Sequence, residues 1–541
     1  MNWNLGDILE GVESAVPPEN DALIHGDRTI SWGELAKRSN NLIRHFQQLG
    51  LEPGDKIAFY LRNQPAYMES VVVCFKGRFV HTNINYRYTD EELLYILDNS
   101  DAAAVIFDEE FASRVEDIRD RAGKVKHWIN VCEDSSRDIP GGHNYEALAL
   151  DGDGAPVAVE RSPDDLLFIY TGGTTGMPKG VMWRHEDFFY GTGGGAIPAF
   201  NISAPKDLAG HVSGIQPIIG QFRQLVGSPL MHGMGLISAI VSLMWGGTVI
   251  TLTKNNFDAK EAWEVVTRNR ATAMAIVGDV FARPLLRALQ EADGQYELSS
   301  MGGIVSSGVM WSKEVKQGLL EYLPQVVLTD GFSSSEAFGI AASVTTKDGE
   351  SEAATFAVGR DCKVFSEDFR EIKPGSDESG LIARSGPIPV GYYKDPEKTA
   401  KTFPTIDGVR YTMPGDWCTV AADGTLTLLG RGSVCINTGG EKVYPEEVEE
   451  ALKLHSSVDD ALAVGLPDEK WGQRIVAVVQ LAANFELDEL GLRNQVREAL
   501  AGYKIPKEIF IINNLGRGPN GKADYKAITA YAATKSAGAA S

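Results

Sequence analysis

The sequence LLFIYTGGTTGMPKG, residues 166–180, places an apolar segment directly before a turn of glycines and threonines that leads to Lys179. The apolar residues predict a buried strand. After a strand, such a turn presents backbone N–H groups and hydroxyls to a phosphate, and Lys179 adds a positive charge. A Met-Pro pair separates Gly176 from Lys179, and Gly180 stands where the P-loop of nucleoside triphosphatases needs Ser or Thr. The stretch therefore predicts a phosphate loop of another class, and a glycine-rich hairpin without a ligand is the alternative.

Short β-rich runs alternate with helical patterns on both sides of this stretch. The alternation predicts an α/β fold in which a large N-terminal domain contains more than one mixed, largely parallel sheet. The clearest pairs are strand 56–61 with helix 65–75, strand 103–107 with helix 109–121, and strand 272–277 with helix 281–291.

The pattern changes after residue 429, where Gly430-Arg-Gly-Ser433 interrupts it. The remaining sequence is enough for a small, mobile α+β lid. Its predicted elements are a helix at 445–453, strands at 461–466 and 474–481, and a helix at 489–500. We therefore predict a domain at 1–431 and a second at 432–541, with fraying of the terminal residues 532–541.

The composition indicates a globular protein, because 43% of the 541 residues are hydrophobic and 23% are charged. The formal net charge of −22 repels nucleic acids and anionic lipids, so we expect neither as a partner. A polyanionic small molecule would have to be bound by local backbone N–H groups, basic side chains and a metal ion.

Several features favour a cytoplasmic location. Five scattered cysteines fit neither a disulfide framework nor a zinc cluster, and the first residues lack the pattern of a secretory signal. Residues 225–253 carry no formal charge and are long enough to cross a bilayer, but Gly246 and Gly247 divide them. We expect a buried helix at 237–245 and a buried strand at 248–252 instead of a membrane span.

Single residues elsewhere have the chemistry of a nucleotide site, and each also has an ordinary structural explanation. Glu336 after a serine-rich turn suits Mg²⁺, or is an exposed loop carboxylate. Phe332 suits stacking on a base, although aromatic residues more often lie in a core. Asp416 suits the ribose hydroxyls, or caps its own backbone. Lys522 suits charge stabilisation at a phosphate, or is only solvated.

These residues lie in motifs that resemble, in order along the chain, those of the adenylate-forming superfamily of acyl-CoA synthetases, firefly luciferases and peptide-synthetase adenylation domains. Stretch 170–180 is similar to the signature loop of that superfamily. Further motifs follow at residues 229–235, 306–310, 329–336, 391–397, 411–416, 430–431, 438–447, 501–506 and 519–522. The N-terminal third is also similar. The sequence of residues 170–189 looks most like that of bacterial fatty-acyl and steroid-side-chain CoA ligases.

The resemblance implies ATP, Mg²⁺ and coenzyme A as cofactors or co-substrates, and it assigns residues to each. It assigns Mg²⁺ binding to Thr171 and Glu336. These two residues, Lys522 and His232 are the predicted catalytic residues. The remaining assignments are adenine to Gly308, Val309, Met310 and Phe332, ribose to Asp416 and Arg431, and the hinge to Ser433. Further predicted contacts to the nucleotide and coenzyme A are Gly172, Gly173, Thr174, Thr175, Gly176, Lys179, Asp330, Gly331, Ser335, Asn437, Gly439, Gly440 and Lys442.

His232 is predicted to position the acyl group and not to act as a base, because a carboxylic acid is already ionised at pH 7. A buried structural histidine is its alternative. The sequence also departs from the family pattern at Gly172, Phe332, Ser335, Pro414 and Ser433, and only the change at Ser433 puts something in doubt, namely the energetics of the domain rotation.

The resemblance implies two half-reactions, in which the acid attacks the α-phosphate of ATP and coenzyme A then attacks the acyl-adenylate. Small apolar residues at 214–247 and the uncharged 304–310 favour a fatty acid or a bulky, steroid-side-chain-like acid. Whether Arg223 faces that pocket is left open, as is a homodimer. The alternatives are an aryl acid, transfer of the acyl group to a carrier protein, and an inactive nucleotide-binding regulator.

Overall fold

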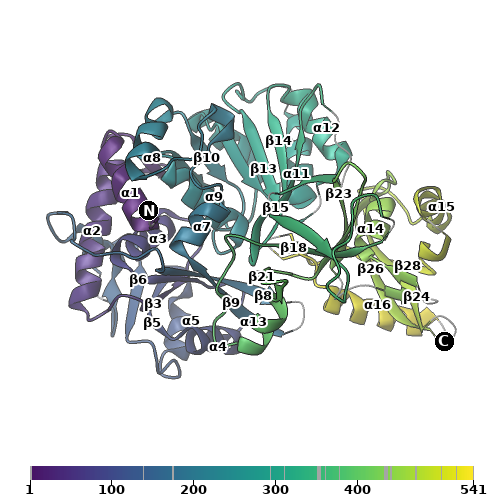
Figure 1. Cartoon of the computed structure of the whole chain (residues 1–541), viewed down its shortest axis with the longest axis horizontal. Coiled ribbons are helices and arrows are strands. Elements are labelled where there is room, and N and C mark those ends of the chain that lie inside the picture. The colour runs from purple at the N-terminus through teal and green to yellow at the C-terminus, as the bar shows by residue number, and fades with distance from the viewer. Residues whose placement is uncertain are drawn as a thin grey trace. The chain divides into compact units, whose positions relative to one another are not determined.

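The computed structural model describes residues 3–539 except 138, 174–175, 293, 310, 350–354, 360, 377, 432–435, 439–440, 469–471, 501 and 519–520. The chain forms two compact units (Figure 1), the first from Met1–Ser351 and Arg384–Thr412, the second from Glu352–Ala383 and Met413–Ser541. This division does not coincide with the boundary predicted at 431/432. That boundary concerns the moving lid and stays a prediction.

One sheet of the first unit contains the glycine-threonine stretch. Strands β3 to β8 are parallel, and β9 and β19 run antiparallel at one edge. The order across the sheet is β19 (Gly391–Tyr392), β9 (Gly176–Arg184), β8 (Leu166–Gly173), β4 (Val80–Asn83), β3 (Lys56–Tyr60), β5 (Ala102–Asp108), β6 (His127–Val131) and β7 (His143–Asn144).

In the other main sheet of the first unit, the strands β1, β10, β11, β12, β13 and β14 are parallel. Strands β2 and β15 pair antiparallel with β1 and β14. The order across this sheet is β15 (Ala337–Thr345), β14 (Val327–Ser334), β13 (Gly303–Ser307), β12 (Ala273–Ile276), β10 (Arg223–Val226), β11 (Thr248–Thr251), β1 (Asp21–His25) and β2 (Arg28–Ser31). The two sheets confirm the predicted α/β class with mixed, largely parallel strands.

The helices of the first unit begin at recognisable sequence signals. Pro65 opens α3, and Thr89 forms a capping box with Glu92 at the start of α4. The helices are α1 (Leu5–Ala15), α2 (Trp32–Gln48), α3 (Pro65–Gly77), α4 (Asp90–Ser100), α5 (Ala112–Ile118), α6 (Tyr145–Leu150), α7 (His185–Gly191), α8 (Leu208–Ile215), α9 (Gly233–Met244), α10 (Ala259–Asn269), α11 (Gly278–Glu291), α12 (Lys313–Tyr322) and α13 (Pro396–Thr402). The single helix predicted at 109–121 is wrong at its start, because Glu109–Phe111 is a 3₁₀ turn that precedes α5.

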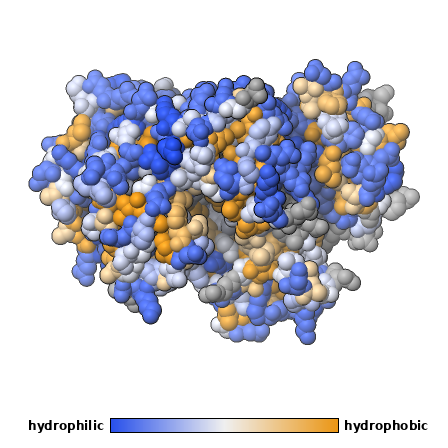
Figure 2. Space-filling view, turned by 90° about the horizontal axis from the view of Figure 1, so that it is seen from above, coloured by the Kyte–Doolittle hydropathy of each residue, from blue (hydrophilic) through white to orange (hydrophobic). Residues whose placement is uncertain are grey.

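The uncharged residues 225–253 fold as expected into a helix, α9, and a strand, β11 (Thr248–Thr251). Leu236, Leu243 and Ile250 are buried there. No helix within the described ranges is both long and apolar enough to span a membrane. Hydrophilic residues cover most of the face shown in Figure 2, and hydrophobic residues gather between them in small groups.

The second unit contains two sheets. The first has the order β17 (Cys362–Phe365), β18 (Gly380–Arg384), β22 (Asp416–Val420), β23 (Leu426–Arg431) and β16 (Thr355–Val358). The second has β25 (Glu441–Val443), β24 (Ile436–Thr438), β27 (Gly472–Leu481) and β26 (Val458–Asp468), and β28 (Glu508–Ile511) also pairs with β27. Helices α14 (Pro445–Lys453), α15 (Glu489–Ala499) and α16 (Tyr525–Ala539) complete the unit.

The predicted fraying after residue 532 is wrong for the described part of the C-terminus. Helix α16 continues to Ala539, Ala532 is fully buried, and the Ser536 hydroxyl donates to Glu508 at 2.9 Å. Alanine is the strongest helix former, so a run of small residues prolongs this helix once its inner face is packed. The prediction considered composition alone and missed that packing.

Candidate active site

The glycine-threonine stretch forms the tip of an antiparallel hairpin between β8 and β9. Thr171 and Lys179 are Cα partners, and Gly173 pairs with Gly176 next to the tip. The expected loop is thus shorter than predicted, because both flanks are extended strands. Thr174 and Thr175 lie outside the described residues, and the surroundings of Gly172, Gly173 and Gly176 are not described either. The hairpin places Thr171 directly across from Lys179.

Lys179 is held at the side of this hairpin by an ion pair with Asp395. Asp395 also caps α13 by accepting from the Lys398 N–H at 2.9 Å. The hydrogen bond from Lys179 and that from Lys398 N–H keep the pKa of Asp395 below its usual value. About a quarter of each side chain is exposed (30% and 23%), so the pair is weak enough for a phosphate to replace the carboxylate.

Glu336 is brought to the same hairpin by contacts that its sequence position does not reveal. It lies in the turn between β14 and β15, and only 9% of it is exposed. The Tyr392 hydroxyl donates to Glu336 Oε1 at 2.7 Å, and Tyr392 belongs to β19, which pairs with β9. Trp183 of β9 donates to the Ser335 carbonyl at 2.9 Å. The turn with Glu336 is therefore fixed against the strand that carries Lys179.

The surroundings of Glu336 fit a magnesium ion that is shared with phosphates. One carboxylate oxygen accepts from Tyr392, and no basic side chain of the described chain forms an ion pair with Glu336. No group of three or more His, Cys, Asp or Glu suitable for a metal occurs in the described ranges. Mg²⁺ commonly takes one or two carboxylates and completes its shell with phosphates and water. Thr171 and Glu336 could hold it in that way.

The carboxyl ends of β13 and β14 bring the predicted adenine residues to one edge of the sheet. These strands are parallel, with Ser307 opposite Gly331. Gly308 follows with φ +97°, a conformation that favours glycine, and half-buried Phe332 follows Gly331. Met310 lies outside the described residues. An exposed glycine beside a half-buried aromatic ring leaves room for a flat base.

Asp330 has a different environment from the one its assignment suggested. Its buried carboxylate forms an ion pair with buried Lys316 of α12 at 3.2 Å. Burial raises the pKa of Asp330 to about 6, although Lys316 opposes the shift. While this pair persists, only the backbone of Asp330 can meet the predicted nucleotide.

His232 caps α9, and one face of that helix is apolar and only half-buried. Met234, Ile237, Val241 and Trp245 recur at helical spacing on this face. Trp245 follows the far end of the helix and packs on Phe222. Met234 and Ile237 lie in the first turns of α9, so their incomplete burial leaves apolar surface next to His232. This is the arrangement that a hydrophobic acyl group would need.

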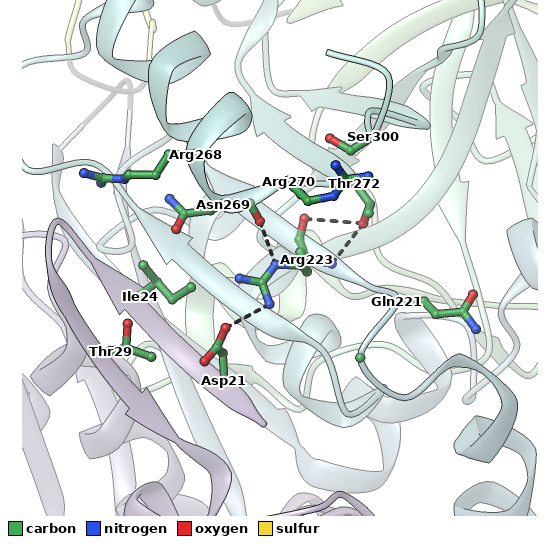
Figure 3. A pocket seen from close by; sticks show the side chains of 11 residues that line it. Asp21, Ile24, Thr29, Gln221, Arg223, Arg268, Asn269, Arg270, Thr272 and Ser300 are labelled. Atoms are coloured by element: carbon green, nitrogen blue, oxygen red, sulfur yellow. Dashed lines mark hydrogen bonds and ion pairs between the residues drawn. The ribbon is translucent and has the colours of Figure 1, made fainter. Parts of the chain in front are cut away.

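Arg223 does not lie at the apolar face of α9 next to His232. It begins β10, and its guanidinium meets Asp21 at 3.0 Å and the Asn269 carbonyl at 2.8 Å, as Figure 3 shows. These contacts lie in a cavity of about 590 Å³ at the amino ends of β1, β10 and β12, which also contains Arg268 and Arg270. His232 and Gly308 follow the carboxyl ends of strands of this sheet. Arg223 therefore lies at the opposite edge.

The second unit holds the remaining assignments. Asp416 is buried and is the Cα partner of Arg431 across β22 and β23, which brings the two predicted ribose contacts together. Asn437 and Lys442 are partners in the β24–β25 hairpin. The side-chain surroundings of Arg431, Asn437 and Lys442 are not described, and Ser433, Gly439 and Gly440 lie outside the described residues.

Lys522 is exposed and lies beside a fixed turn. The Lys522 carbonyl accepts from Gly518 N–H at 2.9 Å, and Gly521 in the turn has φ +71°. Arg517 supports this turn by donating to the Gly521 carbonyl at 3.2 Å, and it forms an ion pair with Asp460 of β26. The backbone at Lys522 is thus linked through Arg517 to the sheet of the small unit.

Sequence reasoning missed Tyr392 and Trp183 as parts of this site. Tyr392 lies inside the quoted motif at 391–397, but nothing in that motif indicates that its hydroxyl reaches Glu336. Trp183 immediately follows the hairpin residues and reads as an ordinary core aromatic. Only the pairing of β19 with β9 could have pointed to the first of them.

Comparison with known proteins agrees with this geometry. Residues 12–393 match the family described as AMP-binding enzyme, and residues 447–522 match the AMP-binding enzyme C-terminal domain. A medium/long-chain-fatty-acid–CoA/3-oxocholest-4-en-26-oate–CoA ligase of Mycobacterium marinum is 40% identical over 97% of this chain and 95% of its own length. A 3-oxocholest-4-en-26-oate–CoA ligase of Rhodococcus rhodochrous is 39% identical over the same shares.

The fold has a solved counterpart in the anthranilate CoA ligase AuaEII in complex with anthranoyl-AMP. The TM-score is 0.83 at 20% identity, over 98% of this chain and 97% of the other. At that identity the match speaks for the fold alone. The family matches and the two similar ligases carry the assignment, and they confirm the resemblance to adenylate-forming acyl-CoA synthetases: the chain belongs to the AMP-binding enzyme family.

Proposed function

We propose that this enzyme is an AMP-forming acyl-CoA synthetase that converts ATP, a hydrophobic carboxylic acid and coenzyme A into acyl-CoA, AMP and diphosphate. The observation that supports the proposal is that Thr171 and Lys179 are Cα partners in one hairpin, while Tyr392 of β19, the strand paired with that hairpin, donates to Glu336. A glycine-threonine strand turn near a carboxylate that has no basic partner among the described residues suits a magnesium nucleotide.

In the first half-reaction, a carboxylate oxygen of the acid forms a bond to the α-phosphorus of ATP. The bond from that phosphorus to the bridging oxygen breaks, and diphosphate leaves with the electron pair. When bound, Mg²⁺ neutralises charge on the phosphate oxygens. Lys179 exchanges its ion pair with Asp395 for an ion pair with phosphate. Lys522, delivered by the lid, stabilises the charge that develops as diphosphate leaves.

In the second half-reaction, the thiolate of coenzyme A attacks the acyl carbonyl and AMP leaves. The lid rotates between the two steps and withdraws Lys522. The hinge at Ser433 and the wall of the coenzyme A tunnel at Thr438–Lys442, with Gly439, Gly440 and Lys442, belong to this part of the proposal, as does the predicted contact of Asn437. A cytoplasmic location and a homodimer remain predictions.

The acid is proposed to be a medium- or long-chain fatty acid or a steroid-side-chain acid. The two similar ligases are named for such acids. The half-buried apolar face of α9, from Met234 to Trp245, supports the same choice, because burying its exposed surface would favour a large apolar acyl group. Arg223 does not argue for a diacid, since Asp21 and the Asn269 carbonyl already bind it.

A panel of carboxylic acids tests the proposal, with diphosphate release as the readout. The panel runs from acetate through long-chain acids to aryl and steroid acids. We expect the highest kcat/KM for the long-chain and steroid acids, with AMP release that depends on coenzyme A and needs no carrier protein. A preference for aryl acids would overturn the substrate class. Absence of acid-dependent diphosphate release across the panel would favour an inactive nucleotide-binding protein.

A further inference from the structure

Asn83 joins two chain segments that lead to residues of the candidate site. It ends β4, and only 4% of it is exposed. Its amide oxygen accepts from Tyr170 N–H at 2.7 Å. Its amide nitrogen donates to the Tyr170 carbonyl at 2.9 Å and to the Met231 carbonyl at 2.7 Å. One side chain therefore binds two backbone segments that are far apart in the sequence.

Each of these segments leads directly into the site. Tyr170 precedes Thr171 at the start of the phosphate hairpin, and Met231 precedes His232 at the start of α9. The hairpin belongs to one sheet of the first unit, and the segment before α9 leaves β10 of the other. Asn83 is thus a direct link between the phosphate side and the acyl side.

Asn63 holds the acyl side in the same way. Its amide nitrogen donates to the Ser228 carbonyl at 3.0 Å, and its amide oxygen accepts from Leu230 N–H at 2.7 Å. It reaches only the segment that ends at Met231. Asn63 fixes that segment, whereas Asn83 relates it to the hairpin.

An ordinary buried asparagine provides the contrast. Asn144 is also buried, and its amide nitrogen donates to the Asp134 and Arg137 carbonyls, which lie 10 and 7 residues away. The corresponding bonds of Asn83 span 87 and 148 residues. A side-chain amide has two N–H donors and one acceptor oxygen, and Asn83 uses both kinds in relating two parts of the site. No apolar or acidic residue of this size could do so.

We propose that Asn83 is a positioning residue for the first half-reaction, which aligns the carboxylate of the acid with the α-phosphate of ATP. The inference rests on the proposed function. Reaction needs the attacking oxygen about 3 Å from phosphorus and in line with the leaving group, and a misplacement of about 1 Å can cost about 100-fold in rate. The second half-reaction does not depend on this alignment, because the acyl-adenylate already joins both parts by a covalent bond.

The test compares both half-reactions in one preparation of each variant. Adenylation is measured as single-turnover diphosphate release without coenzyme A, and thioester formation is measured from supplied acyl-adenylate. The ratio of the two rates cancels any loss of folded protein. For Asn83→Ala we expect this ratio to fall about 100-fold. Asn83→Ser, which retains one donor and one acceptor, serves if the alanine variant is insoluble, and Asn144→Ala is the matched control.

Two results would overturn the inference. One is a ratio for the Asn83 variants that falls less than about tenfold, since poor alignment should cost more than that. The other is an equal fall of the ratio in Asn144→Ala, which would mean that any buried asparagine has this effect. Failure of the wild-type enzyme in both half-reactions would instead contradict the proposed function and would be recognised before any variant is made.

Discussion

The two ends of the parallel strands β10 to β14 differ in how their charged side chains are paired. At the amino ends, Arg223 binds Asp21 and the Asn269 carbonyl, and Arg268 binds Asp27 and the Gly26 carbonyl. Beyond the carboxyl ends, Glu336 is buried against a tyrosine hydroxyl, and no basic side chain of the described chain pairs with it. Cations bound by the chain itself indicate a structural role, whereas we propose that a carboxylate without a basic partner among the described residues binds an external cation.

The largest effect is expected at Lys522, the cation that the proposed mechanism takes from the lid. Replacing Lys522→Ala should lower adenylation about 10³-fold, because charge on the departing diphosphate loses a direct partner. Thioester formation from supplied acyl-adenylate should survive, since that step does not need Lys522. Rapid-quench measurement of each half-reaction checks this, and an equal loss in both would refute the assigned role.

The next effect concerns the carboxylate of Glu336. Glu336→Gln keeps the shape and the hydrogen bond from Tyr392 but removes the charge, so kcat/KM should fall about 100-fold and half-maximal rate should need more Mg²⁺. Tyr392→Phe is the matched control, and loss of one hydrogen bond should cost about fivefold. A magnesium titration of Glu336→Gln that coincides with wild type would show that the metal does not bind there.

A smaller effect is expected from the buried pair of Asp330 and Lys316. The pKa of Asp330 is raised to about 6 in the folded protein, so its contribution to stability is complete below the unfolded value near 3.8 and is lost as pH rises through 6. Relative to Asp330→Asn, wild type should lose about 1–3 kcal/mol of unfolding free energy between pH 4 and 7. Urea unfolding of both proteins across this range checks it, and a constant difference would contradict the assigned pKa.

The smallest effect is expected at the amino ends of strands β10 to β14. Arg223→Gln removes a cation that Asp21 and the Asn269 carbonyl already bind, so the relative kcat/KM for long-chain and short-chain acids should change less than about threefold. Competition between two acids in one reaction measures this ratio directly. A marked shift toward apolar acids would place Arg223 near the acyl group after all.

Prediction from the sequence succeeded where the signal was local. The proline at 445 and the pattern after it predicted a helix at 445–453, and α14 is Pro445–Lys453. The metal-binding role that the serine-rich turn suggested for Glu336 stays a prediction. Prediction failed at the C-terminus, where packing of Ala532 overrides a composition typical of a frayed end.

Contacts between residues far apart in the sequence could not be predicted, because the local sequence does not indicate them. Tyr392 meets Glu336 only because β19 pairs with β9, and Asn83 meets Met231 across 148 residues. Neither a tyrosine in a motif nor a polar residue at the end of a strand carries a mark of its distant partner. Side chains that assemble a site from two sheets therefore become visible only in the fold.

Exchange of labelled diphosphate into ATP, with Mg²⁺ and a long-chain acid but without coenzyme A, tests the central claim most directly. Rapid exchange that stops when the acid is omitted is expected, because adenylate formation is complete before coenzyme A takes part. Exchange that requires coenzyme A, or none with any acid of the panel, would contradict that claim.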